Sequence, residues 1–224
     1  IAFDVVTGTA LGCGGFAVAL LVYILNKGEY HPLVRPAILT SLLGYGLAVL
    51  AVTVDLGRFW ELWKVPVFFW RWSHSPQLEV ALCVALYVLV LTIELSPAFF
   101  EKWRTSPDSG LRSFAEKGLA FVKRYFVWIL ALGILLPTMH QSSLGSVLLI
   151  LGSRLSPLWY TIWLPLLYLI SALTMGYGVV MLEATLVQRA FKTPSEVALF
   201  ARLSRVVAGL LAGFLVLRWG DLIY

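Results

Sequence analysis

Long apolar runs separated by short polar stretches dominate the chain. Six of these runs are about 20 residues long, which is the length that an α-helix needs to cross the apolar core of a bilayer. We place the predicted spans at about 5–25, 36–56, 78–96, 125–145, 163–186 and 197–217. The pattern therefore predicts an all-α, polytopic transmembrane helical bundle that forms a single transmembrane domain over residues 1–224.

Three stretches depart from this simple pattern. Residues 59–77 combine Trp, Phe and Pro with scattered cations, which is typical of a segment that lies at the depth of the lipid headgroups. Residues 99–124 are rich in charge and are predicted to form a cytoplasmic loop with a short amphipathic helix at 111–123. In the fourth span, Pro137 is followed by several polar residues, so we expect the helix to break near Pro137.

The composition supports a membrane protein and excludes a soluble globular domain. Hydrophobic residues make up 60% of the chain and charged residues only 13%, whereas an ordinary globular domain has about a quarter charged residues. The net charge of +5 does not indicate nucleic-acid binding, because Lys and Arg fall in short clusters between the apolar runs. Cys13 and Cys83 both lie inside apolar runs and are predicted to be buried thiols.

The distribution of cations predicts an orientation. Of the 17 Lys and Arg residues, twelve fall in the connections after the first, third and fifth spans, and five fall on the opposite side. Because cytoplasmic loops carry the excess of Lys and Arg, we predict that the twelve-cation side is cytoplasmic. Ile1 then lies on the outer side, so we expect another span to precede this sequence, and further spans to follow it.

Polar residues in or beside the apolar runs are candidates for function, because a charged group at membrane depth costs free energy. One group falls at the predicted outer ends of helices from four spans, where its members could line one pocket: Asp4, Asp55, Arg58, Glu79 and His140. A second group lies deeper or towards the inner side and could carry protons: Tyr45, Glu94 and Glu183.

Each of these residues also has a purely structural interpretation. Asp55 and Arg58 are three residues apart at a helix end and could pair with each other. Glu79 could be a first-turn carboxylate favoured by the helix dipole, and Glu94 could extend its carboxylate to the nearby cytoplasmic surface. His140 could be a structural histidine, whereas Glu183 is flanked by apolar residues and has no cation before Arg189.

The histidines and cysteines predict no haem or metal in this subunit. A haem held between two transmembrane histidines needs paired histidines within spans. Of the three histidines, His31 and His74 fall in loops on opposite sides, and only His140 falls near a span. Two isolated cysteines cannot form an iron–sulfur or zinc cluster.

Four runs of residues carry a resemblance to a known family. These are Gly-Glu-Tyr-His-Pro-Leu-Val-Arg-Pro (28–36), Asp-Leu-Gly-Arg (55–58), Leu-Pro-Thr-Met-His-Gln-Ser-Ser (136–143) and Leu-Arg-Trp-Gly-Asp-Leu-Ile-Tyr (217–224). They resemble the polysulfide-reductase or NrfD-type membrane subunits, with those of the hydrogenase-2 type as the nearest pattern. The likeness extends over nearly the whole chain, and it departs from the family pattern between Arg58 and Glu79.

The resemblance implies about ten spans and no haem, and it places the chain as a multi-pass protein of the bacterial cytoplasmic (inner) membrane. Such subunits exchange electrons between menaquinone or ubiquinone and an iron–sulfur electron-transfer subunit docked at the outer face. That subunit in turn serves a hydrogenase or other catalytic subunits. Besides these subunits, the expected partners are the quinone and membrane lipid, and not nucleic acid.

Family roles transfer to the positions that match. Tyr45, Glu79, His140 and Glu183 match positions implicated in quinone handling or proton transfer, and Asp55 and Arg58 match the Asp-x-Gly-Arg run. We therefore expect a quinone pocket formed by Asp55, Arg58, Glu79 and His140, and an inward proton path through Glu183 and Tyr45.

Two alternatives to this function are considered. The first is a passive anchor or scaffold, in which the acidic residues only orient helices. The second is a secondary transporter, for which inverted repeats of interrupted helices are expected.

Overall fold

The computed structural model describes residues 2–71, 75–150, 152–154, 156, 158–192 and 197–223. All elements in these ranges are helical, which confirms the predicted all-α class. In chain order they are α1 (Ala2–Leu11), α2 (Gly14–Ala19), the π-helix η1 (Leu20–Ile24), the 3₁₀-helix η2 (Gly28–Leu33), α3 (Val34–Asp55), η3 (Phe59–Glu61), α4 (Lys64–Val67), η4 (Phe69–Arg71), α5 (Pro76–Trp103), α6 (Ser109–Ile150), η5 (Gly152–Arg154), α7 (Leu164–Phe191) and α8 (Val197–Ile223).

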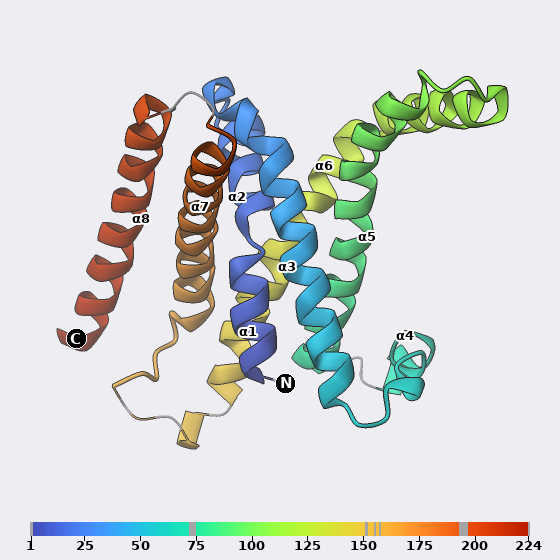
Figure 1. The fold of residues 1–224 in the computed structure, drawn as a ribbon. Coiled ribbons are helices and arrows are strands. Elements are labelled where there is room, and N and C mark those ends of the chain that lie inside the picture. The colour runs from blue at the N-terminus through green and yellow to red at the C-terminus, as the bar shows by residue number, and fades with distance from the viewer. Residues whose placement is uncertain are drawn as a thin grey trace.

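Six of the helical segments are long and apolar enough to cross a membrane, as the sequence pattern predicts. They are Val5–Ile24, Gly28–Asp55, Gln77–Trp103, Ser109–Ile150, Leu164–Phe191 and Val197–Ile223. Successive segments run in opposite directions through the bundle (Figure 1). The described part of the chain is therefore a polytopic helical bundle.

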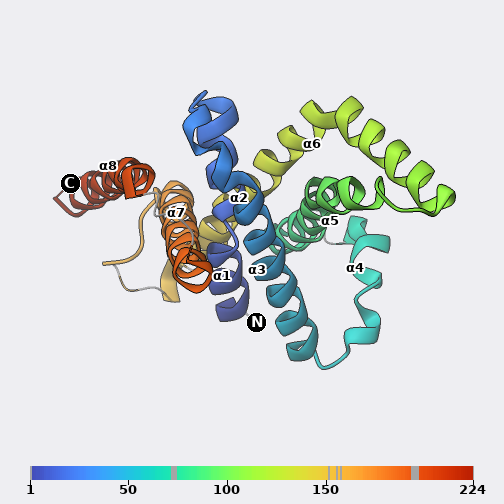
Figure 2. The same cartoon turned by 45° about the horizontal axis from the view of Figure 1, so that its top comes forward.

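The first segment, made of α1, α2 and η1, lies at the centre of the bundle. It packs on α3 on one side and on α7 on the other, and α2 also contacts α6. Helices α5 and α6 form the most extensive helix pair, while α8 packs chiefly on α7 at the edge (Figures 1 and 2). The buried apolar residues form two clusters, one where α1 and α2 meet α3, α5 and α6, and one where they meet α7 and α8.

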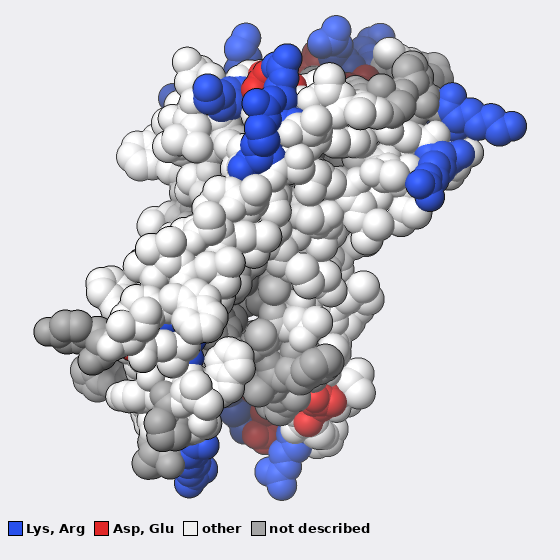
Figure 3. Space-filling view, turned by 90° about the vertical axis from the view of Figure 1, so that its left-hand side faces the viewer, with Lys and Arg blue, Asp and Glu red and all other residues white. Residues whose placement is uncertain are grey.

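The charged side chains lie at the two ends of the bundle, and a broad band without charges separates them on the face that Figure 3 shows. The end formed by η2, the α5–α6 turn and the α7–α8 connection carries the twelve cations counted above, and we call it the basic end. The end with α4 and η5 is the opposite end. This separation agrees with the expected membrane position of the helices.

Close helix packing explains the glycines where α3 and α7 cross the first segment. A Cβ atom on Gly44 of α3 would lie 3.0 Å from Gly12 Cα, so the two backbones almost touch. A Cβ atom on Gly176 of α7 would lie 2.8 Å from the carbonyl carbon of Cys13. Small residues at these crossings let the dispersion contacts form that hold helices together in lipid.

Most of the charged stretch 99–124 is helical: the helix predicted at 111–123 is present as part of α6, whereas the predicted loop around it is wrong except at 104–108. Helix α5 continues to Trp103 and α6 begins at Ser109, so only a tight turn connects them. The many Lys, Arg and Glu residues here are good helix formers once the apolar face is packed. The Asp108 carboxylate accepts a hydrogen bond from the Gly110 amide at 2.9 Å, which caps the start of α6.

Residues 59–71 form three short helices, η3, α4 and η4, whose large aromatic side chains are mostly exposed. They lie beside the opposite end of the bundle and do not cross it (Figure 1). Lys64 pairs with Glu61 at 2.9 Å, and Arg71 lies 5.1 Å from the ring centre of Phe68. These features suit the predicted position at headgroup depth, which stays a prediction.

The expected break at Pro137 is wrong, because α6 runs without interruption from Ser109 to Ile150. Proline removes one backbone hydrogen bond and leaves the carbonyl of residue i−4, here Gly133, without its helical donor. Neighbouring helices make this tolerable within a membrane bundle. Pro137 is buried in the described core, so the packing of α6 against its neighbours holds the helix together there.

Candidate functional site

A hydrogen bond between two fully buried side chains lies at the centre of the bundle. The Tyr45 hydroxyl of α3 and Nε2 of His140 of α6 are 2.9 Å apart, and both side chains are 0% exposed. Their rings meet edge to face at 5.4 Å. Tyr45 lies halfway along α3, so this pair sits in the middle of the apolar layer, where polar side chains are costly and usually functional.

The contacts of His140 indicate which ring nitrogen carries the proton in the neutral imidazole. Nδ1 lies 3.2 Å from the carbonyl oxygen of Leu136, which can only accept, so Nδ1 carries the proton. Nε2 is then the acceptor, and Tyr45 donates its hydroxyl proton to it. A tyrosine hydroxyl that donates a hydrogen bond to a neutral imidazole is positioned to transfer its proton to that imidazole.

Gln141 ties this pair to the first segment. Its Nε2 lies 3.1 Å from His140 Nε2, 3.2 Å from Thr9 Oγ1 and 3.2 Å from Cys13 Sγ. Cys13 Sγ in turn lies 3.8 Å from the Tyr45 hydroxyl. We call Thr9, Cys13, Tyr45, His140 and Gln141 the central polar cluster; three helical segments contribute to it, and none of the five is more than 2% exposed.

The helix of the first segment is interrupted at this cluster. Between α1 and α2, the Cys13 amide donates to Ala10 O instead of Thr9 O. The Cys13 thiol donates to Thr9 O at 3.0 Å, and the Gly15 amide donates to Ser41 Oγ of α3 at 2.6 Å. Side chains thus satisfy backbone groups that the interruption releases, which is the condition for irregular backbone at membrane depth.

Tyr87 extends the cluster to α5. Its ring meets that of Tyr45 edge to face at 4.8 Å, and it is 1% exposed. It belongs to the same buried cluster as Cys13 and Phe16, beside the interruption of the first segment. Four helical segments therefore converge on one polar centre.

The predicted quinone-pocket residues occupy two different depths. His140 lies level with Tyr45 and not at the outer helix end, because α6 does not break at Pro137. Glu79 lies in the first turn of α5 and accepts a hydrogen bond from Ser143 Oγ at 2.8 Å, one turn of α6 from His140. Asp55 and Arg58 are exposed at the end of α3, and the side chain of Asp4 lies outside the described residues.

Glu183 is half-buried on α7 and accepts a hydrogen bond from the Thr40 hydroxyl of α3. Thr40 lies five residues before Tyr45 on the same helix, towards the basic end, which is about 7.5 Å along the axis. The structure thus joins Glu183 to α3 but leaves a gap between it and the central polar cluster. Tyr45 is paired with His140 instead.

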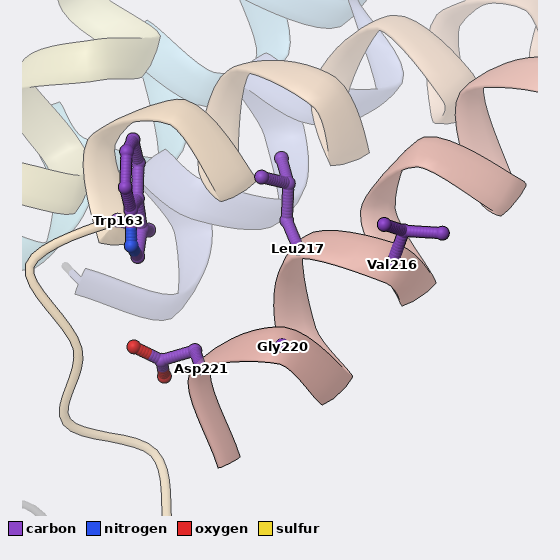
Figure 4. Close-up of a pocket in the computed structure, with 5 residues that line it drawn as sticks. All are labelled: Trp163, Val216, Leu217, Gly220 and Asp221. Carbon is purple, nitrogen blue, oxygen red and sulfur yellow. The ribbon is translucent and has the colours of Figure 1, made fainter. Parts of the chain in front are cut away.

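Two cavities lie between α7 and α8, away from the predicted site. Figure 4 shows one of about 360 Å³ that is lined by Trp163 of the loop and by the end of α8, including Asp221. The other, of about 310 Å³, is lined by apolar side chains and Arg218. Arg218 pairs with Asp221 at 3.1 Å, and Asp221 accepts a hydrogen bond from Thr161 at 2.6 Å, so these polar residues anchor the loop to α8.

The two described histidines lie in different surroundings. His140 has both ring nitrogens in hydrogen bonds, and His31 is exposed in η2 at the basic end. His74 lies outside the described residues. Within the parts of the chain that the structure describes, no group of three or more His, Cys, Asp or Glu side chains could hold a metal ion.

Residues 5–222 match the family described as Polysulphide reductase, NrfD. The chain belongs to the NrfD family. It is 42% identical, over its whole length, to a Ni/Fe-hydrogenase 2 b-type cytochrome subunit of Escherichia coli K12, and it covers 55% of that protein. It is 30% identical over 84% of its length to the menaquinone reductase integral membrane subunit of Nitratidesulfovibrio vulgaris Hildenborough, and covers 44% of that protein.

This NrfD-family chain thus spans about half the length of the curated relatives that it matches. No solved structure matches it. The family assignment confirms the resemblance that the four sequence runs carry.

Sequence reasoning found two members of the central polar cluster of the NrfD chain, Tyr45 and His140, and missed the other three. Gln141 was visible only as a polar neighbour of His140. Thr9 and Cys13 are four residues apart and so lie on one helical face; this spacing was the feature of the sequence that could have pointed to them. Neither residue type is unusual within a membrane helix, and only the packing of α6 against α2 reveals their role.

Proposed function

We propose that the chain is the membrane part of a quinone-linked respiratory oxidoreductase of the bacterial inner membrane. Two relatives carry names of this class, a hydrogenase subunit and a menaquinone reductase subunit. The observation that carries the proposal is the fully buried Tyr45–His140 hydrogen bond in the apolar layer. A membrane protein that only anchors a complex has no need of this costly pair.

In this proposal, menaquinone or ubiquinone is the substrate and binds towards the opposite end. Glu79 and Ser143 lie nearest to the central polar cluster, with Asp55 and Arg58 at the adjacent end of α3. Quinone reduction takes up two protons with two electrons, so titratable groups must deliver protons inside the membrane. The Tyr45–His140 pair performs this transfer, and Glu183 with Thr40 forms a branch towards the basic end.

The proposal places the basic end in the cytoplasm and an iron–sulfur electron-transfer subunit at the opposite, outer end. The excess of Lys and Arg at the basic end supports this orientation. The catalytic partner is a nickel–iron hydrogenase or another outer oxidoreductase. The arrangement of His31 and His140 supports the absence of haem from this subunit, although the similar E. coli protein is named a b-type cytochrome subunit.

Substitutions in the full-length subunit within its complex test the proposal. Glu79→Gln and His140→Gln should each lower quinone-linked turnover by about 100-fold or more, because proton transfer by a positioned group contributes at least that much. Turnover with a soluble dye that accepts electrons directly from the catalytic subunits should stay unchanged. Glu61→Gln is the matched control, because Glu61 is an exposed carboxylate at the same end that pairs with Lys64.

The passive-anchor alternative makes the opposite prediction. If both variants retain quinone-linked turnover while the complex assembles normally, the buried groups only orient helices, and the proposed function is wrong.

A further inference from the structure

Glu94 is a carboxylate deep in α5, and the proposed function assigns it no role. It lies nine residues before the helix ends at Trp103, about 14 Å from the basic end. It lies seven residues, or about 10 Å, beyond Tyr87 of the same helix. None of the ion pairs among the described residues includes Glu94.

Instead of extending towards the basic end, the carboxylate rests in a notch on α6. A Cβ atom at Gly133 would lie 2.5 Å from Glu94 Oε1, so the carboxylate occupies the space that a side chain would need. Gly133 is the residue whose carbonyl Pro137 leaves without a helical donor. No described Lys or Arg pairs with the carboxylate in this notch, which favours the neutral carboxyl form.

Titratable groups lie on both sides of Glu94. Towards the centre, Tyr87 lies two turns before Glu94 on the same face of α5, and its ring contacts that of Tyr45. Towards the basic end, the ring of Tyr23 of η1 meets that of Phe126 edge to face at 5.7 Å, and Phe126 lies two turns before Gly133 on the same face of α6. The ring of Tyr23 meets the ring of His31 edge to face at 6.4 Å, and His31 is exposed at the basic end.

We propose that Glu94 is the proton-holding residue of an inner route that connects the basic end, through His31 and Tyr23, with the central polar cluster, through Tyr87. The notch at Gly133 holds the neutral carboxyl group, and this inference rests on the proposed function. The route lies along α5 and α6 and is separate from the Glu183–Thr40 contact between α7 and α3.

The proton balance is simple. A proton that enters at His31 binds to the Glu94 carboxylate and forms the neutral carboxyl group. When His140 or Tyr45 gives a proton to the substrate, the Glu94 O–H bond breaks and its proton replaces the one lost at the cluster. Tyrosine hydroxyls and water pass the proton by accepting one and donating another. Glu94 returns to the carboxylate and is protonated again from the basic end.

The test uses the full-length subunit in its complex, reconstituted into liposomes. Glu94→Gln keeps the shape of the side chain but cannot release a proton, so quinone-linked turnover and charge movement across the membrane should fall about tenfold or more. Gly133→Ala should also lower both, because the added methyl group displaces only the flexible end of Glu94. Gly178→Ala on α7 is the matched control, since a Cβ atom there has no neighbour within 4 Å.

A spectroscopic measurement separates a proton-holding role from a structural one. The infrared difference spectrum between oxidised and reduced complex should contain a carboxylic-acid C=O band that Glu94→Gln removes. Unchanged turnover and charge movement in Glu94→Gln, or an unchanged infrared band, would overturn the inference. If Glu94→Gln does not assemble, Gly133→Ala decides by the same measurements. Failure of the proposed function looks different, because the Glu79→Gln and His140→Gln variants would then retain quinone-linked turnover, or the unmodified complex would show none.

Discussion

The Tyr45 hydroxyl is a single group whose removal separates catalysis from stability. Tyr45→Phe keeps the ring packed against Tyr87 and removes the donor to His140. His140 Nε2 retains Gln141 as a donor at 3.1 Å, so no buried acceptor is left without a partner. A hydrogen bond between membrane helices contributes on average about 0.6 kcal/mol, with a maximum near 1.7. The variant should therefore fold and assemble.

Quinone-linked turnover should fall far more than this stability loss explains. If Tyr45 passes a proton to and from His140, turnover should drop by about 100-fold to 10,000-fold, the range for a positioned proton donor. The assay is turnover of the reconstituted complex with a quinone analogue, alongside thermal unfolding of the same preparation.

Tyr177→Phe is the matched control. Tyr177 is also buried, at 3% exposed, and its hydroxyl donates to Ala17 O at 2.7 Å, but it does not contact His140. It should lose similar stability and keep turnover. Equal losses of turnover in Tyr45→Phe and Tyr177→Phe would refute the argument, because both hydroxyls would then act only through packing.

Two further predictions concern packing and haem. Gly176→Ala should destabilise the bundle by about 1–3 kcal/mol, because the new Cβ atom would meet the Cys13 backbone at 2.8 Å, whereas Gly178→Ala should unfold at nearly the unmodified temperature. The purified full-length subunit should show no b-type haem absorption bands. Such bands in a reduced-minus-oxidised spectrum would contradict this prediction.

The helices could be predicted from sequence because lipid imposes a strict rule on the backbone. A segment in the apolar layer must satisfy its own hydrogen bonds, so about 20 apolar residues indicate a helix with little ambiguity. The rule says nothing about where a helix continues into water. Residues 99–124 were therefore predicted to be a loop with only a short helix at 111–123, although α5 and α6 extend through most of them.

The two irregularities of the spans show where local signals fail. Pro137 lies near the middle of a predicted span and was expected to break it, yet α6 continues through it. The interruption falls instead at Gly12 and Cys13, where no proline is present. Its stabilising partners, Ser41 and the Cys13 thiol, include a residue from another helix, so the sequence of the first segment alone does not predict it.

The interruption of the first segment, together with Gly12, brings that segment into contact with the other residues of the central polar cluster. A Cβ atom at Gly12 would lie 2.5 Å from the Tyr45 ring, so the absence of a side chain there lets the ring approach the broken helix. The break turns the Cys13 thiol to Thr9 O and within reach of Gln141 and Tyr45. The Gly15 amide after the break bonds to Ser41 Oγ of α3 at 2.6 Å, so side chains take the place of backbone partners that the break removes. The break and the missing side chain at Gly12 therefore bring the first segment and α3 together at the point where Cys13, Gln141 and Tyr45 meet.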